Sequence, residues 1–295
     1  MSGWPPPPGC MTIPLRIGLD LVASSRWAST VVGVGATVAP VHACLRVGAT
    51  RALRGSAAVA TGLLIAASTL VSPASAAPAN IAGKIVFLDP GHNGSNDASV
   101  ISRQVPTGRG GTKDCQASGT STDDGYAEHT FAWDTTLRIR QALTALGVRT
   151  AMSRGDDTGV GPCVDERAAM ANSLRPDAVI SIHGDGGPSN GRGFHVLYSS
   201  PPLNDVQAGP SVRLASIMKD QLQASGLVPS TYIGSGGLNP RSDIAGLNLA
   251  QFPSILVELG NMKNPADSAL MKSPEGRQKY ADAVVRGIAG FLGSS

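Results

Sequence analysis

The sequence has little net charge, few aromatic residues and no apolar run long enough to cross a bilayer comfortably. Its formal net charge is +3, and Phe, Trp and Tyr make up 4% of the 295 residues. Because Lys and Arg do not cluster with interleaved aromatic side chains, we expect no nucleic-acid partner. A mildly basic chain suits an anionic polymer at a cell surface better.

The amino-terminal part of the chain has the pattern of a secretory signal peptide. Arg51 and Arg54 precede an apolar stretch over residues 57–71, and small residues in an A-x-A arrangement follow up to Ala76. About fifteen apolar residues are too few to span a bilayer easily, so an uncleaved anchor is the less favoured alternative. We predict cleavage between Ala76 and Ala77.

This pattern predicts two parts of the chain, an extension with a signal peptide over residues 1–76 and a single mature domain over residues 77–295. The mature protein is expected to be secreted across the cytoplasmic membrane, without stable membrane insertion after processing. Its expected location is periplasmic or cell-wall associated. No internal repeat is present, and we expect a monomer.

Cysteine is scarce. Cys10 and Cys44 precede the predicted cleavage site, so the mature chain keeps only Cys115 and Cys163. Two cysteines in an exported protein most simply form a disulfide, with free thiols or metal ligands as the alternatives. Their spacing matches no zinc-ribbon pattern.

The mature part alternates strand-like and helix-like segments, which is typical of an α/β fold with a central, mostly parallel twisted sheet flanked by helices. The expected strands cover residues 84–88, 148–152, 178–182, 194–198 and 255–257, and the expected helices cover residues 127–146, 164–174, 206–225, 266–271 and 275–291. Residues 93–125 and 227–248 are rich in glycine and polar residues, and both segments are expected to be irregular. A loop as long as the first usually has a function.

Polar side chains stand at the ends of three apolar strands. His92 follows the first strand, His183 ends another, and Glu258 ends a third. A lone buried carboxylate costs several kcal/mol, so Glu258 needs a metal, a cation or a reacting proton nearby. Because ligands bind outside the carboxyl ends of parallel strands, these three side chains are expected to meet.

Glu128 adds a fourth polar group to the same place. It lies four residues before Ala132 and therefore on the inward stripe of the helix that it begins. His92, Glu128 and His183 form a two-histidine, one-glutamate set that suits catalytic zinc, and Glu258 is the candidate general base. An alternative set replaces Glu128 by Asp89 or Asp185. His129 is interpreted as solvated and His195 as a packing residue.

The same residues resemble a known family. The segments Phe87-Leu88-Asp89-Pro90-Gly91-His92-Asn93-Gly94, Ser181-Ile182-His183-Gly184-Asp185 and Leu256-Val257-Glu258-Leu259-Gly260-Asn261, with Glu128 between the first two, resemble type-3 N-acetylmuramoyl-L-alanine amidases. The resemblance covers residues 85–291 and is strongest to secreted mycobacterial members that consist of a catalytic domain alone. Arg167 and Asn172 also match, and we assign them a structural role.

The resemblance implies a zinc-dependent hydrolase that cuts the amide between N-acetylmuramic acid and L-alanine in peptidoglycan or muropeptides. It assigns zinc to His92, Glu128 and His183, and catalysis to Glu258. A zinc peptidase acting within the stem peptide and a non-catalytic wall-binding protein are the alternatives. The chain departs from the family pattern where Gly184 and Asp185 replace the usual Ala-Asn after the histidine.

Overall fold

The computed structural model of the protein describes residues 81–294. The predicted N-terminal extension with its signal peptide (residues 1–76), the cleavage site and the first residues of the predicted mature domain lie outside the described residues. No helix within residues 81–294 combines the length and the apolar character needed to cross a membrane.

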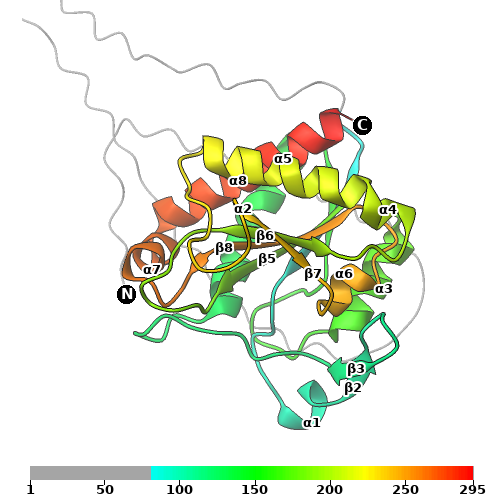
Figure 1. The fold of residues 1–295 in the computed structure, drawn as a ribbon, viewed down its shortest axis with the longest axis horizontal. Helices are drawn as coiled ribbons and strands as arrows, with labels where there is room; N and C mark the ends of the chain where they lie inside the picture. The colour runs from blue at the N-terminus through cyan, green and yellow to red at the C-terminus, as the bar shows by residue number, and fades with distance from the viewer. Residues whose placement is uncertain (1–80, 295) are drawn as a thin grey trace, which may run out of the picture. The chain divides into compact units, whose positions relative to one another are not determined.

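A six-stranded sheet forms the centre of residues 81–294 (Figure 1). Its strands are β1 (Ile85–Pro90), β4 (Arg149–Met152), β5 (Ala178–Asp185), β6 (His195–Ser199), β7 (Leu238–Arg241) and β8 (Ser254–Asn261), in the spatial order β4-β1-β5-β8-β6-β7. The first four strands in that order are parallel, β6 is antiparallel to β8, and β7 is parallel to β6. The expected mostly parallel sheet is confirmed.

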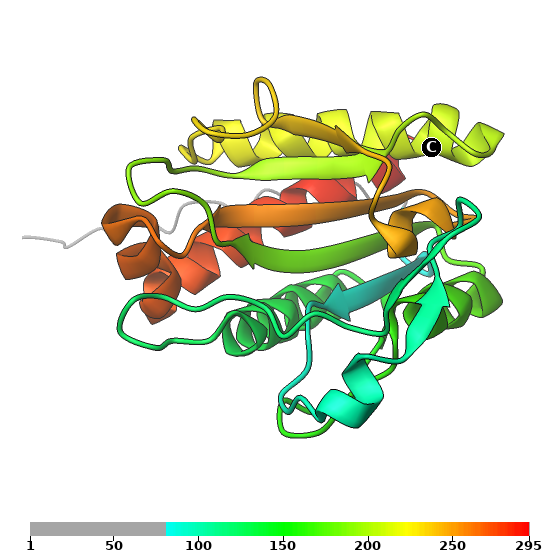
Figure 2. The ribbon, with the colours of Figure 1, turned by 60° about the horizontal axis from the view of Figure 1, so that its bottom comes forward.

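Three long helices cover one face of this sheet. They are α2 (Glu128–Ala145), α5 (Pro210–Ala224) and α8 (Pro274–Gly293), and Figure 2 shows α2 and α8 behind the strands. Alternate strand residues such as Leu88, Ile180 and Val257 point to this face and are fully buried against the helices. Burying one such side chain contributes about 1.5–3 kcal/mol, so this face is the main core.

The opposite face is covered by smaller elements. Helix α3 (Val164–Leu174) packs on β1, and α6 (Ala245–Asn248) packs on β6, β8 and α3. Leu197, Leu247 and Leu256 form a separate small cluster there. In Figure 2, α6 and the two-stranded hairpin of β2 (Gln104–Pro106) and β3 (Thr112–Asp114) lie in front of the sheet.

Helix α2 forms where the sequence predicts it. Ala132, Thr135, Ile139 and Leu143 recur every three or four residues and are completely buried, so the predicted inward stripe is confirmed. The helix stops before Gly147, whose φ of 76° is accessible to glycine at little cost. The inward stripe places the first residue of α2, Glu128, over the end of the sheet.

Three predicted segments differ from the structure. Residues 93–125 contain α1 (Ala98–Ile101) and the β2–β3 hairpin, and residues 227–248 contain β7 and α6. These elements have only three or four residues, which is too short to show a period in the sequence. The helix expected over 206–225 is divided into α4 (Asp205–Ala208) and α5, because Gly209-Pro210 interrupts it. The last two helices are confirmed as α7 (Pro265–Lys272) and α8.

Candidate metal centre

The three predicted strand ends meet at one edge of the sheet. The backbone N–H of Gly91 donates to the Ile182 carbonyl over 2.9 Å, which holds the turn after β1 against β5. Pairing of β5 with β8 places His183 directly beside Glu258. The first turn of α2 reaches the same edge and adds Glu128.

His92, Glu128 and His183 form a group that has the composition and spacing of a metal site. One ligand atom from each lies within 4.8 Å of the others. Glu128 Oε1 lies 2.9 Å from both His92 Nε2 and His183 Nδ1. The imidazole rings are almost perpendicular, with centroids 4.8 Å apart. The structure therefore brings together the three side chains that the sequence predicts as ligands.

The His92 ring has a defined orientation. Its Nδ1 lies 2.8 Å from the Ala117 carbonyl oxygen, which can only accept, so Nδ1 carries a hydrogen and donates it. Nε2, the ring nitrogen left for a metal ion, faces Glu128 Oε1. A metal-binding histidine usually donates its other ring N–H to an outer partner, and here that partner is a backbone carbonyl.

The Glu128 carboxylate is buried and held on both oxygens. Oε2 accepts from the Thr120 backbone N–H over 2.9 Å, and Oε1 accepts from Gly184 N–H over 3.2 Å. Burial opposes ionisation of Glu128, but its hydrogen bonds with His183 and His92 outweigh burial and lower its pKa. Burial also opposes charging of His92, and Glu128 outweighs it and raises the pKa of the imidazole.

These donors fit a zinc ion. Zinc binds imidazole nitrogen and carboxylate oxygen, and a catalytic site supplies three such ligands while a fourth position takes water or substrate. Here two imidazoles and one carboxylate converge, and both His92 and Glu128 have backbone partners outside the cluster. The donor set therefore matches the chemistry that the sequence analysis expects.

The alternative carboxylates are engaged elsewhere. Asp89 accepts from Arg167, Ser153 and Ser181 over 2.6–2.9 Å. Burial raises the pKa of Asp89, but the Arg167 guanidinium and these hydroxyls outweigh it and lower the pKa to about 2. Asp185 is hydrogen-bonded to His195 and Tyr232, so the geometry favours Glu128 as the third ligand.

Glu258 lines the same cleft without belonging to the ligand group. Its Oε2 is buried and has no hydrogen-bond partner within residues 81–294. Burial, followed by the nearby carboxylates of Glu128 and Asp185, raises the pKa of Glu258 well above its ordinary value. An orphan carboxylate oxygen beside a candidate metal site is suited to accept a proton.

A polar network that the sequence analysis missed borders Glu258. Asp185 Oδ2 lies 3.0 Å from His195 Nε2 and accepts from the Tyr232 hydroxyl over 2.8 Å. His195 is 2% exposed, as expected for a packing residue, but it is also hydrogen-bonded. The antiparallel register places His195 opposite Glu258. The spacing of the histidines carries no signal for this reversal of strand direction.

His129 lies outside the ligand group. Its Nδ1 is 2.9 Å from Asp157 Oδ1, and its side chain is only 20% exposed. The interpretation of His129 as a solvated residue is therefore wrong, because Asp157, which the sequence analysis did not consider, folds over the start of α2.

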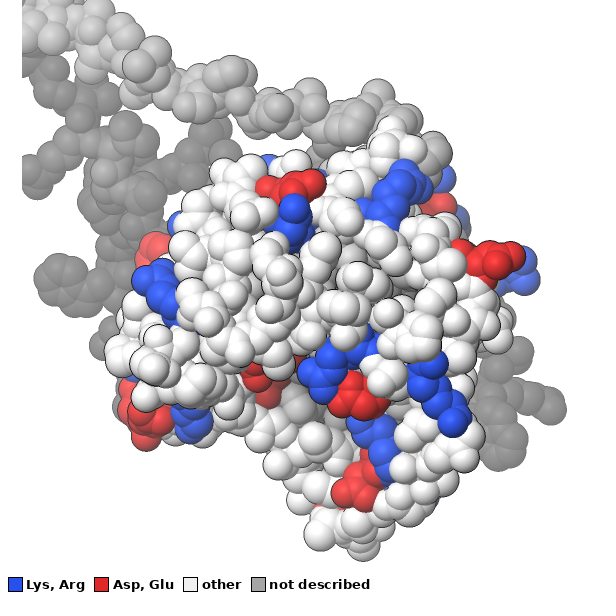
Figure 3. All heavy atoms as spheres, in the orientation of Figure 1, with Lys and Arg blue, Asp and Glu red and all other residues white. Residues whose placement is uncertain are grey.

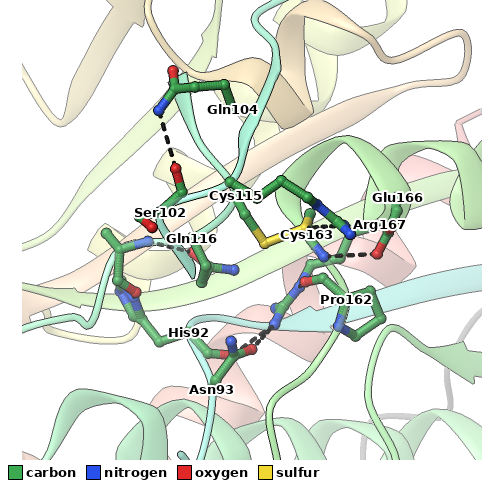
Figure 4. The surroundings of a disulfide bond; sticks show 12 residues. His92, Asn93, Ser102, Gln104, Cys115, Gln116, Pro162, Cys163, Glu166 and Arg167 are labelled. Carbon is green, nitrogen blue, oxygen red and sulfur yellow. Dashed lines mark hydrogen bonds and ion pairs between the residues drawn. A yellow bond between two sulfur atoms is a disulfide. The ribbon is translucent and has the colours of Figure 1, made fainter. Parts of the chain in front are cut away.

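Cys115 and Cys163 form the predicted disulfide, which links the long loop to the start of α3. Figure 4 shows Gln116, the residue after Cys115, close to His92, with Arg167 directed at Asn93 below the disulfide. The same loop continues to the Ala117 carbonyl and the Thr120 N–H, which contact His92 and Glu128. The bridge thus anchors the segment that covers two predicted ligands.

The cluster opens into a cleft of about 540 Å³. His92, His183 and Glu258 line it, and it continues over Leu256 and Ala171 between the sheet and α3. On the face that Figure 3 shows, blue and red side chains lie beside one another and most of the surface is uncharged. Neither sign of charge dominates that face.

Comparison with known proteins gives consistent matches. Residues 86–290 match the family model described as N-acetylmuramoyl-L-alanine amidase. An N-acetylmuramoyl-L-alanine amidase of Mycobacterium tuberculosis is 73% identical over 232 residues, covering 78% of this chain and 96% of that protein. The crystal structure of the amidase Ami1 from Mycobacterium smegmatis has a TM-score of 0.73 at 81% identity, covering 73% of this chain and 100% of the other. For Ami1 from Mycobacterium abscessus, the corresponding values are 0.71, 68%, 72% and 100%.

Proposed function

Because this chain belongs to the N-acetylmuramoyl-L-alanine amidase family, we propose that it is a zinc-dependent hydrolase of peptidoglycan. Its substrate bond is the amide between the lactyl group of N-acetylmuramic acid and the L-alanine of the stem peptide. His92, Glu128 and His183 hold zinc in this proposal, and Glu258 is the catalytic carboxylate. The relatives support peptidoglycan amidase activity. Zinc dependence is inferred from the group of three ligand donors.

One observation carries the proposal: three ligand donors converge beside a carboxylate that has an unpartnered buried oxygen. A bound zinc ion would polarise the amide carbonyl and make the attacking water more acidic. A non-catalytic wall-binding protein has no use for Glu258 in this place. The arrangement therefore favours hydrolysis.

Glu258 moves the proton. It accepts a proton from the attacking water, whose oxygen bonds to the carbonyl carbon, and donates it to the nitrogen as the carbon–nitrogen bond breaks. The raised pKa of Glu258 makes its carboxylate a stronger base than an exposed glutamate. The products are a lactyl carboxylate and a stem peptide with a free amino group on L-alanine.

The proposed site of action is outside the cytoplasmic membrane. A disulfide between Cys115 and Cys163 is typical of an oxidising compartment. Peptidoglycan also lies there, so location and substrate agree.

Digestion of purified peptidoglycan followed by mass spectrometry tests the reaction. An amidase releases intact stem peptides that begin with L-alanine, whereas a peptidase acting within the stem leaves L-alanine on the sugar. Release of shorter peptides alone would show that the protein is a peptidase and not an amidase. Absence of any product from the zinc-loaded protein would favour a wall-binding role.

Metal analysis tests the ligand set. His92→Ala and His183→Ala should each lower bound zinc well below one equivalent, because each removes one of three protein ligands. His195→Ala is the matched control, since His195 is a buried histidine of the same cleft that bonds Asp185 and Asn239 and not the ligand group. One full equivalent of zinc in both ligand variants would refute the assignment.

A further inference from the structure

We propose that Arg154 is a positioning residue that fixes the separation of His92 and Glu128 and thereby sets the affinity of the site for zinc. This inference rests on the proposed zinc site. Arg154 lies just after β4 and contributes no ligand, and its side chain is 3% exposed. Its role follows from the backbone groups that its guanidinium contacts.

Arg154 first holds the segment that ends in His92. Its Nε donates to the Pro90 carbonyl over 3.1 Å, and one terminal nitrogen donates to the Gly91 carbonyl over 3.3 Å. These are the two residues immediately before His92. The guanidinium therefore binds the backbone one and two residues before the first proposed ligand.

The same terminal nitrogen also reaches the start of α2. It donates to the carbonyl of His129, the residue after Glu128, over 3.0 Å. A single rigid guanidinium thus joins the β1 turn to the helix that carries the second proposed ligand. Its planar geometry fixes the distance between the two segments better than a flexible ammonium group does.

Asp157 fixes the guanidinium from the other side. Its Oδ1 accepts from Arg154 over 2.8 Å and lies 2.9 Å from His129 Nδ1. Its Oδ2 accepts from the Thr130 hydroxyl over 3.0 Å. Arg154 and Asp157 therefore bind the first turn of α2 through both its backbone and its side chains.

Both segments need such support. His92 has a φ of 61°, a left-handed conformation that is strained for a residue with a Cβ atom. Within residues 81–294, the N-cap residue of α2, Ala127, has no side-chain hydrogen bond to the helix. A strained ligand backbone and a helix start without a side-chain cap persist only where surrounding groups determine them.

Arg167 differs from Arg154 in the backbone groups that it contacts. It donates to the Pro90 carbonyl over 2.9 Å and to the His92 carbonyl over 2.7 Å. These contacts hold the His92 side of the site alone. Arg154 is the arginine that contacts both sides, so its loss should disturb the spacing of the ligands.

The test compares Arg154→Lys with Arg277→Lys in the purified protein. Arg277 is also largely buried and donates to backbone carbonyls, those of Met271 and Lys272. It contacts α2 through the Asp134 side chain and lies over the Tyr126 ring, but it bonds neither the β1 turn nor the backbone of the first turn of α2. Zinc affinity is measured by competition with a chromophoric chelator, and the site geometry is followed by the visible spectrum of bound Co²⁺. Thermal melting with and without zinc reports the stability of each variant.

We expect Arg154→Lys to lower zinc affinity about 10- to 100-fold and to change the Co²⁺ spectrum, because outer partners of metal ligands have effects of this size. Arg277→Lys should lower the melting temperature without changing either reading. Unchanged affinity in Arg154→Lys would overturn the inference, as would equal losses in both variants. If Arg154→Lys does not fold, Asp157→Ala replaces it, with a loss of at least about fivefold expected and no loss overturning the inference.

The same assay distinguishes failure of the proposed zinc site from failure of the role of Arg154. Wild-type protein that binds no zinc in the same competition assay would remove the proposed function together with the role of Arg154. Wild-type protein that binds zinc while the variant binds equally well would remove only the role of Arg154.

Discussion

Removing the Glu258 carboxylate should abolish hydrolysis and leave the metal in place. Glu258→Ala eliminates the group that transfers the proton, so turnover is expected to fall by about 10²- to 10⁴-fold. Glu258 is outside the ligand group, so zinc content should stay at one equivalent. Glu258→Gln is the matched control of shape, and near-wild-type turnover in either variant would exclude Glu258 from the mechanism.

Asp89 gives a pH-dependent prediction. Its pKa falls from 3.8 to about 2 on folding, so its contribution is complete above the unfolded pKa and disappears as the pH falls through the folded one. The shift corresponds to about 2 kcal/mol of stability. Urea unfolding of wild type and Asp89→Asn at pH 6 and pH 3 should show a difference that shrinks with acid. A difference independent of pH would contradict ionised Asp89 as its source.

Single residues were predictable where one strand end determined their place. His92, His183 and Glu258 each follow an apolar run, and their meeting requires only that neighbouring strands be parallel. The link between Asp185 and His195 depends on β6 running the other way. Side-chain types and spacing do not encode that direction.

Among the elements, the long loop between β1 and α2 depends on its disulfide. Replacing both cysteines by serine opens the 48-residue loop that the bridge closes, which gives the unfolded chain more conformational freedom. In the chain-entropy model this costs about 4 kcal/mol of stability, so the melting temperature should fall by about 10 °C. Zinc affinity should change less, because Arg154 and Arg167 still hold the His92 segment from the other side.

Melting curves and zinc titrations of the double variant, with the oxidised wild type as reference, check this prediction. A melting temperature that stays the same would show that the bridge does not stabilise the fold. A zinc affinity that falls more than stability does would show that the loop, and not the arginines, holds His92.

Element lengths explain what sequence patterns identified and what they missed. Helix α2 has eighteen residues and α8 has twenty, and both were predicted to within a few residues. The two strands of the β2–β3 hairpin, β7 and α6 have three or four residues each, and tertiary contacts rather than local preference decide their structure. Ser199 and Asn248, for example, reach the hairpin through the side chain of Arg109.

For the whole molecule, zinc should act as a stabilising ligand. Binding to the folded state alone adds about 4 kcal/mol when free zinc exceeds the dissociation constant a thousandfold. The protein stripped by a chelator should stay folded, since Glu128 bonds both imidazoles directly. We therefore expect chelation to abolish activity and lower the melting temperature by about 10 °C.

Calorimetry with Zn²⁺ added back checks this expectation. Mg²⁺ is the control, because it prefers oxygen ligands and should not raise the melting temperature. His183→Ala should lose the zinc-induced rise. An equal rise in that variant would place the stabilising ion elsewhere.

The fold class was predictable because alternation and strand composition are properties of the whole chain. The order of the strands was not, because β8 is inserted between β5 and β6 although it is last in sequence. That insertion gives Glu258 its neighbours His183 and His195.

The glycine at position 119 has a consequence for how this protein can change. A Cβ there would lie 2.9 Å from the His92 ring and 3.1 Å from Glu128 Oε2, and its φ of 83° also disfavours a side chain. At position 119 the pocket wall is bare main chain, so substitution there cannot add a recognition group without displacing His92 or Glu128. A change of substrate preference is instead open to positions whose side chains line the same pocket, such as Asp185, Ile233 and Arg241.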